Sequence, residues 1–157
     1  MIIRLFKYED AKEVSNLVSK TMMTNNIKDY DIDYLRKDIG ERTPKFFIDR
    51  SKYLHCYICL INNKIVGTGS IGPYWGKSDE SSLFNIFVDP EFQGKGIGKT
   101  IINTLENDIY FKRAKRVEIP SSITALNFYR TMGYDFKNNN NKLDDERLFR
   151  LEKFNYK

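Results

Sequence analysis

The amino-acid sequence predicts an α/β (α+β) fold in one domain over residues 1–157, with a mixed central sheet flanked by helices. Short apolar runs typical of strands alternate with segments whose apolar residues recur every three or four positions, as in helices. About six to seven strands and about four helices account for this pattern. The length suits a single domain, and no repeat, linker or change of composition divides the chain.

The composition is that of an ordinary globular protein with a mild positive charge. Hydrophobic residues make up 41% of the chain and charged residues 30%, enough for both a core and a solvated surface. The net charge of +5 favours anionic partners, either phosphates or nucleic acid. Arg4 and Lys7 interrupt the N-terminal apolar run, and no stretch approaches the ~20 apolar residues of a membrane span. We therefore expect a cytoplasmic protein with no membrane partner.

Cys56 and Cys59 form a C-x-x-C pair, which raises the question of a redox or zinc site. They fall within residues 53–61, an almost continuously apolar run that predicts a buried strand. Residues three apart on a strand point to opposite faces, so the two thiols should not meet. With His55 the single histidine, we expect structural thiols and no metal site.

The N-terminal segments predict a strand followed by two helical stretches. Residues 2–6 form an apolar run, and Asp10 with Glu13 resembles a capping box at the start of a helix. Apolar residues at helical spacing follow, namely Ala11, Val14, Leu17, Val18 and Met22. A second helix is predicted over residues 34–39, resuming near residues 46–50.

A hairpin comes next. Residues 53–61 and 64–71 are predicted strands joined by Asn62 and Asn63, and asparagine tolerates the positive φ of a tight turn. A loop is predicted at residues 72–81.

Four further strands are predicted by apolar runs at residues 83–88, 117–119, 134–136 and 147–154. Pro120 is expected to end the second of these strands, and Gly133 suits the position just after a helix. The apolar positions of the two intervening helices are Ile97, Ile101, Ile102, Leu105 and Ile109 in the first, and Ala125, Phe128, Tyr129 and Met132 in the second.

The segment between Val88 and Thr100 predicts an anion-binding site. A strand ends at Val88, and glycine permits positive φ and close approach of a ligand to the backbone. The first amides of a helix lack internal partners and carry the positive end of the helix dipole. Lys95 and Lys99 add positive charge, so the segment suits a phosphate or pyrophosphate. Three alternate glycines precede the helix: Gly94, Gly96 and Gly98.

Two familiar phosphate motifs do not fit this turn. A P-loop requires glycine where the chain has Gln93, and a dinucleotide fingerprint requires one more residue between its last two glycines. A third pattern, Q/R-x-x-G-x-G/A after a V-x-P strand end, fits at Gln93, Gly96 and Gly98, with Val88 and Pro90 in place.

With this motif, the chain resembles the GNAT superfamily of N-acetyltransferases over nearly its whole length. The resemblance implies the GNAT fold, with the strands at residues 83–88 and 117–119 splayed apart, and acetyl-CoA as cosubstrate without a metal. It also implies that the pantetheine arm runs beside Ile86, Phe87 and Val88. The amides implied to bind the pyrophosphate are those of Gln93, Gly94, Lys95, Gly96, Ile97, Gly98 and Lys99.

A second match, A-L-N-F-Y-R-T-M-G-Y, begins at Ala125. It resembles the family's A-x-x-F-Y-x-x-x-G-F helix, in which the tyrosine protonates the departing thiolate. The resemblance assigns this general-acid role to Tyr129, whose alternative is a core position. Ser122 stands where many members have a cofactor-binding asparagine, and Arg130 is a candidate for the cofactor 3′-phosphate.

The resemblance implies direct attack of a primary amine on the thioester in a ternary complex. An alkyl amine is mostly protonated at neutral pH, so the site must remove a proton. Several residues remain open for this step: Glu80 as a base, Asn85 as a residue that positions water, Glu118, or a relay through water. A backbone N–H of Phe87 or Val88 is implied to hold the oxyanion.

The acceptor amine is a small molecule or a peptide or protein, and the sequence leaves this open. Carboxylates and aromatic rings that suit a cationic amine, or that only form a solvated loop, are Asp29, Asp31, Asp33, Tyr30, Tyr34, Tyr74 and Trp75. The alternatives to an acetyltransferase are a non-catalytic or longer-chain acyl-CoA-binding relative and a basic nucleic-acid-binding module. We expect no nucleic-acid partner, and a homodimer is an option that only the resemblance supports.

Overall fold

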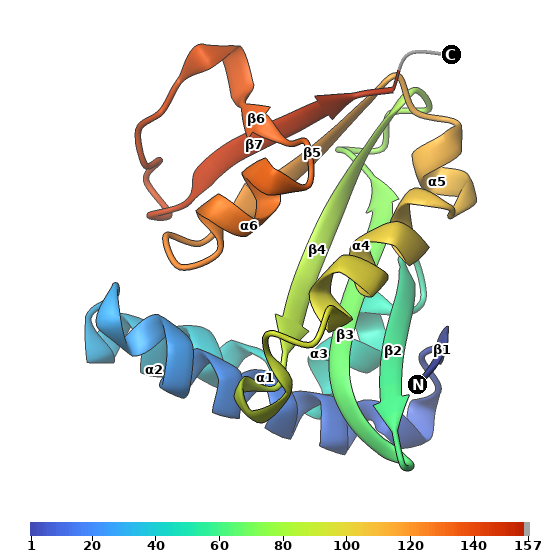
Figure 1. Ribbon diagram of the computed structural model, residues 1–157, viewed down its shortest axis with the longest axis vertical. Helices are drawn as coiled ribbons and strands as arrows, with labels where there is room; N and C mark the ends of the chain where they lie inside the picture. The colour runs from blue at the N-terminus through green and yellow to red at the C-terminus, as the bar shows by residue number, and fades with distance from the viewer. Residues whose placement is uncertain (156–157) are drawn as a thin grey trace.

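The computed structural model describes residues 1–155, which form one seven-stranded mixed sheet with helices on both faces (Figure 1). This confirms the predicted fold class. The strand order is β1-β2-β3-β4-β5-β7-β6, and β4 and β5 run parallel while the other neighbours are antiparallel. The strands are β1 (Ile2–Leu5), β2 (His55–Ile61), β3 (Lys64–Pro73), β4 (Glu80–Val88), β5 (Arg116–Ser121), β6 (Asp135–Phe136) and β7 (Phe149–Phe154).

Six α-helices are found in residues 1–155, two more than predicted, because residues 32–50 form two helices and α5 is separate from α4. The helices are α1 (Ala11–Asn25), α2 (Ile32–Glu41), α3 (Pro44–Arg50), α4 (Ile97–Glu106), α5 (Ile109–Lys112) and α6 (Leu126–Thr131). Four 3₁₀ turns accompany them: η1 (Tyr8–Asp10), η2 (Asn26–Lys28), η3 (Pro90–Phe92) and η4 (Lys137–Asn139).

Apolar side chains fill the space on each face of the sheet. On one face, α1, α2 and α3 pack against Ile58 and Ile65, and on the other face α4, α5 and α6 pack against Cys59 and Val66. Neighbouring residues of β2 thus serve different cores, as the period-2 alternation of a strand requires. Cys59 is buried in the α4 core, and Cys56 is buried beside Arg50 of α3. Both thiols are free, and they lie on opposite faces of β2 as the spacing of the two residues predicts.

The parallel strands β4 and β5 pair over a short distance and then diverge. Their paired positions run from Glu80 opposite Arg116 to Ser82 opposite Glu118. Beyond Ser82, β4 retains only β3 as a neighbour among the described strands. Figure 1 shows β4 and β5 side by side at the top and separated below, with α6 beside β5 and with α1 and α2 beneath the opening. The predicted splay of the central strands is present.

A β-bulge lies in β4 beside this opening. Ser70 pairs with Phe84, but Thr68 pairs with Phe87, so Asn85 and Ile86 together oppose Gly69. Asn85 adopts φ of 50°, a left-handed conformation that asparagine tolerates better than most residues. The bulge bends the strand and turns its side chains at the point where β5 has left it.

Several predicted boundaries are wrong. The strands predicted to begin at residues 53 and 147 begin at His55 and Phe149. Pro120 does not end its strand, because β5 continues to Ser121 and Pro120 pairs with Arg150. A residue without an N–H is tolerated there because β4, on one side, has already diverged. Ile109 does not belong to the helix that contains Leu105: α4 ends at Glu106, and Ile109 begins α5 with 63% exposure. The loop predicted at residues 72–81 is shorter, since both flanking strands extend into it.

Candidate active site

A cavity of about 1050 Å³ occupies the opening between β4 and β5. Its walls come from α1, α2, α3, the bulged part of β4, the glycine turn and α6. The cavity brings together most of the predicted site residues, which are Asn85, Ile86, Phe87, Val88, Gln93, Gly94, Gly96, Ile97, Gly98, Lys99, Ser122 and Tyr129. Segments separated by more than forty positions in the sequence therefore share one site.

The glycine turn presents free backbone amides to the cavity. Gly94 and Gly96 adopt φ of 77° and 80°, and a Cβ on either residue would meet no atom within 4 Å. Gly96 is the N-cap of α4, and no side chain caps this helix. Within residues 1–155, the amides of residues 94–99 donate no hydrogen bond. This is the arrangement expected of an anion site at a helix N-terminus.

The turn is anchored to the rest of the fold by Asp89. The buried Asp89 carboxylate accepts hydrogen bonds from the amide of Glu91 at 2.9 Å and from Lys20 Nζ at 3.0 Å. Burial raises the pKa of Asp89, but the Glu91 amide and the Lys20 ammonium outweigh it, so the pKa lies below its ordinary value of 3.8. Gln93 Nε2 donates to the carbonyl of Val88 at 3.2 Å, which fixes the entry to the turn.

Tyr129 lies in the wall of the cavity, on α6. The residue is 5% exposed, and its hydroxyl makes no hydrogen bond within the part of the chain that the structure describes. Burial raises the pKa of Tyr129 above its ordinary value of 10, so the phenol stays protonated at neutral pH. Ser122, another residue of the wall, accepts a hydrogen bond from the amide of Ala125 at 3.1 Å and so steadies the start of α6.

Asn85 places its side chain at the same cavity through the bulge. Its Oδ1 accepts a hydrogen bond from Arg42 Nε at 3.3 Å, and Arg42 is in turn paired with Asp38. A polar amide, held from one side by a cation, thus borders the exposed edge of β4.

Three predicted site residues lie outside the cavity. Glu80 is held by Arg116 at 3.3 Å, and this hydrogen bond lowers the pKa of Glu80, which makes the carboxylate a weaker base. Arg130 pairs with Asp135 at 3.5 Å. Lys95 projects over the Phe92 ring, with Nζ 5.1 Å from the ring centre.

Glu118 is also unsuited to proton abstraction from an amine in this cavity. Its carboxylate is buried and contacts Lys137 at 2.8 Å and Arg116 at 3.1 Å. It does not border the cavity.

The residues considered for the acceptor divide into two groups. Tyr30 and Tyr34 stack at 5.4 Å and border the cavity, but both hydroxyls are bound to backbone carbonyls of the segment before β7. Tyr30 additionally accepts a hydrogen bond from the amide of Ile123 at 3.0 Å. Asp29 and Trp75 also border the cavity, whereas Tyr74, Asp31 and Asp33 do not.

The structure adds cavity residues that the sequence did not single out: Asp38, Arg42, Phe46, Arg50, Glu146 and Arg150. The first four recur at intervals of four residues, a helical spacing visible in the sequence. Thr43, whose Oγ1 accepts a hydrogen bond from the amide of Phe46 at 3.2 Å, caps a new helix just after Arg42. No single helix therefore carries all four residues, which obscures the pattern.

Comparison with known proteins agrees with this geometry. Residues 19–134 match the model of the acetyltransferase (GNAT) family. An uncharacterized N-acetyltransferase of Methanocaldococcus jannaschii is 29% identical over 153 residues, an alignment that covers 81% of this chain. The chain spans 66% of the length of that archaeal relative.

Solved structures share the fold. The PaiA N-acetyltransferase from Thermoplasma acidophilum, crystallised with coenzyme A, superposes with a TM-score of 0.82 and 16% identity, covering 99% of this chain and 100% of that one. A GNAT family acetyltransferase from Brucella melitensis, crystallised with acetyl-CoA, gives a TM-score of 0.65 and 17% identity over 85% of this chain and 82% of that one.

None of the helices within residues 1–155 is long and apolar enough to span a bilayer.

Proposed function

The chain belongs to the acetyltransferase (GNAT) family, and from this membership we propose that it is an N-acetyltransferase that moves an acetyl group from acetyl-CoA to a primary amine. The observation that carries the proposal is the row of unpartnered amides at residues 94–99, which opens on the same cavity as Tyr129. The relatives crystallised with coenzyme A and acetyl-CoA support the choice of cosubstrate. We place the reaction within a single domain of residues 1–157.

The cofactor would lie along the opening between β4 and β5. The amides of residues 93–99 and the ammonium of Lys99 would bind the pyrophosphate. The pantetheine arm would run beside Ile86, Phe87 and Val88, whose free edge can accept an extended ligand much as it would accept another strand. Ser122 would contact this arm from the opposite wall. The side chains of Lys95 and Arg130 lie outside the cavity, so we assign these two side chains only to contacts with the exposed nucleotide end.

The reaction would proceed by direct attack. The lone pair of the amine nitrogen forms a bond to the thioester carbon, and the carbonyl oxygen becomes an oxyanion held by the N–H of Phe87 or Val88. The carbon–sulfur bond then breaks, and the thiolate takes the proton of the Tyr129 hydroxyl. The proton lost by the amine restores the phenol through water. No acetyl-enzyme forms, because the amine itself is the nucleophile.

Water positioned by Asn85 would take the proton from the amine. Asn85 borders the cavity and is oriented by Arg42, whereas Glu80 and Glu118 lie outside it and are paired with cations. A neutral amide cannot itself accept the proton, so it acts by holding the water that does. Asn85 is accordingly a positioning residue.

Release of free thiol from acetyl-CoA tests this function, across a panel of amines, peptides and aminoglycosides. Transfer to at least one amine, with no acetylated protein isolated when the acceptor is omitted, is the expected result. Stronger thermal stabilisation by longer acyl-CoA forms, with no acetyl transfer, would favour the acyl-CoA-binding alternative. Salt-sensitive binding to a nucleic-acid duplex with no response to coenzyme A would favour the nucleic-acid-binding alternative.

A further inference from the structure

The wall of the cavity around α2 and α3 carries two arginines close to one aromatic ring. Arg42, Phe46 and Arg50 all border the cavity. The guanidinium carbons of Arg42 and Arg50 lie 5.8 Å and 4.7 Å from the centre of the Phe46 ring. All three side chains are half-buried. The ring therefore holds both cations toward the cavity by cation–π contact.

The two arginines differ in their partners. Arg42 is paired with Asp38 and donates to Asn85, so its charge is balanced by an acid. Arg50 makes no side-chain hydrogen bond or ion pair with any residue from 1 to 155. It contacts the rings of Phe46 and Tyr53, and its charge also acts on the Cys56 thiol. A half-buried arginine with a purely structural role is expected to donate hydrogen bonds within the protein. The donors of Arg50 are instead all free to bind a ligand.

None of the described acids that border the cavity is paired with Arg50. Glu146 contacts Arg150 at 3.1 Å, and Asp29 accepts a hydrogen bond from Thr124 at 2.7 Å. Asp38 is engaged by Arg42, and Glu41 is exposed to solvent at the last position of α2. Arg50 thus supplies an uncompensated positive charge to the wall built by α3.

We propose that the acceptor amine also carries a carboxylate, as an amino acid does, and that Arg50 binds this carboxylate. The inference rests on the proposed acetyltransferase function. The planar fork of a guanidinium matches a carboxylate with two parallel hydrogen bonds, and stacking on Phe46 pre-orients the fork. The uncompensated charge of Arg50 also disfavours acceptors whose remaining charges are positive, such as diamines and aminoglycosides. Trp75, 86% exposed at the cavity edge, is placed to cover the acceptor side chain.

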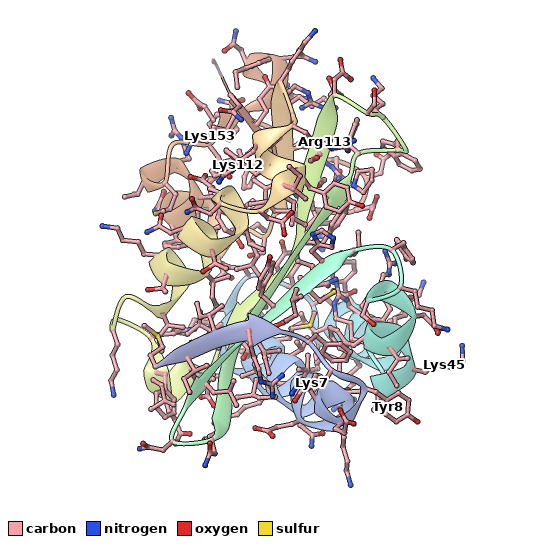
Figure 2. All side chains as sticks on the ribbon, turned by 90° about the vertical axis from the view of Figure 1, so that its right-hand side faces the viewer. Lys7, Tyr8, Lys45, Lys112, Arg113 and Lys153 are labelled. Carbon is pink, nitrogen blue, oxygen red and sulfur yellow. The ribbon has the colours of Figure 1, made fainter. Side chains whose placement is uncertain are left out.

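The test compares matched acceptors on the unaltered protein and on variants of α3. Phenylalanine is compared with 2-phenylethylamine, and lysine with 1,5-diaminopentane, so that each pair differs by the carboxylate alone. Arg50→Gln removes the charge, Arg50→Lys keeps the charge but loses the fork, and Lys45→Gln is the control. Lys45 belongs to the same helix, is 84% exposed and projects away from the molecule into solvent (Figure 2).

We expect the unaltered protein to acetylate the carboxylate-bearing member of at least one pair with a kcat/KM at least tenfold above that of its partner. Arg50→Gln should raise KM for that acceptor by about tenfold to a hundredfold, because a hydrogen bond to a charged group is lost. KM for acetyl-CoA should change by less than about twofold. Arg50→Lys should be intermediate, and Lys45→Gln should match the unaltered protein.

The failures of the two proposals are distinguishable. Equal or better transfer to the amines without a carboxylate overturns the role of Arg50 and leaves the acetyltransferase intact. Release of no thiol with any acceptor refutes the acetyltransferase itself, and the role of Arg50 with it. The comparison of acceptors on the unaltered protein decides the question even if the Arg50 variants do not fold.

Discussion

Ser82 and Glu118 are the last paired residues of the parallel strands β4 and β5, and the sheet opens immediately beyond them. From Leu83 to Val88, one edge of β4 is left without a neighbouring strand among the described residues. The bulge at Asn85 and the free amides after Val88 follow along this same edge. The opening, the bulge and the turn thus form one continuous path, with room for a long thioester and an acceptor.

Replacement of Tyr129 by phenylalanine tests the general acid. We expect Tyr129→Phe to lower kcat by about a hundredfold or more, because the thiolate loses its proton donor, while KM for acetyl-CoA changes little. Tyr134→Phe is a matched control, since the Tyr134 hydroxyl donates to Glu106 at 2.7 Å and does not face the cavity. Steady-state kinetics with both variants decide the matter, and an unchanged kcat in Tyr129→Phe removes the assigned role.

The raised pKa of Tyr129 also predicts the pH dependence. Burial favours the neutral phenol, so ionisation of Tyr129 should cause no loss of kcat up to at least pH 10, the ordinary tyrosine value. A pH profile of kcat provides the check. A fall that begins below pH 10 in the unaltered protein, and is absent from Tyr129→Phe, would contradict it.

Substitution of two glycines distinguishes the free-energy cost of a positive φ from an effect on cofactor binding. Gly96 and Gly76 adopt φ of 80° and 71°, and a Cβ at either would meet no atom within 4 Å. Replacement of either by alanine should therefore lower the free energy of unfolding by a similar ~1–2 kcal/mol. Only Gly96→Ala should weaken coenzyme A binding, by about tenfold or more, because the strain displaces the amides that hold the pyrophosphate. Calorimetric titration with coenzyme A should show this difference, and equal affinities would contradict it.

Asn85 can be replaced in two ways that differ in backbone cost. Asn85→Gly keeps φ of 50° without strain, while Asn85→Ala adds strain, and both variants lose the amide that faces the cavity. If this amide positions the water that accepts the proton, both variants should lose about tenfold or more in kcat. If Asn85→Gly retains full kcat and Asn85→Ala does not, the shape of the bulge matters and the amide does not.

The carboxylate of Asp89 makes the free energy of unfolding depend on pH in the acid range. Its pKa is lowered in the folded state, so its contribution to stability is complete above the ordinary value of 3.8 and is lost as pH falls through the lower folded value. Asp89→Asn should be less stable than the unaltered protein above pH ~5, and the difference should shrink below pH ~4. Urea unfolding over this pH range measures it, with Asp145→Asn as an exposed control. A difference that does not vary with pH would contradict the prediction.

Local signals in the sequence predict the elements that local chemistry controls. Asn62 and Asn63 predict a tight hairpin, and both adopt positive φ, of 50° and 64°. The glycine turn and the helix after it also lie where the pattern indicates. In each case, residues adjacent in the chain determine the backbone conformation.

Properties that depend on distant segments could not be predicted in this way. Glu80 looks like a free acid near the central strand, but it is paired with Arg116, thirty-six positions later. Pro120 predicts the end of a strand, but it pairs with Arg150 of β7, a strand near the C-terminus. Asn85 in the middle of an apolar strand is a local sign of a bulge, but its hydrogen bond to Arg42 becomes apparent only in three dimensions.

The structure of the protein crystallised with acetyl-CoA at saturating concentration is the most direct test of the account. We expect the diphosphate within hydrogen-bonding distance of the amides of residues 94–99 and the thioester between β4 and β5, near Asn85 and Tyr129. A cofactor bound elsewhere, or no density at the glycine turn, would contradict the central claim.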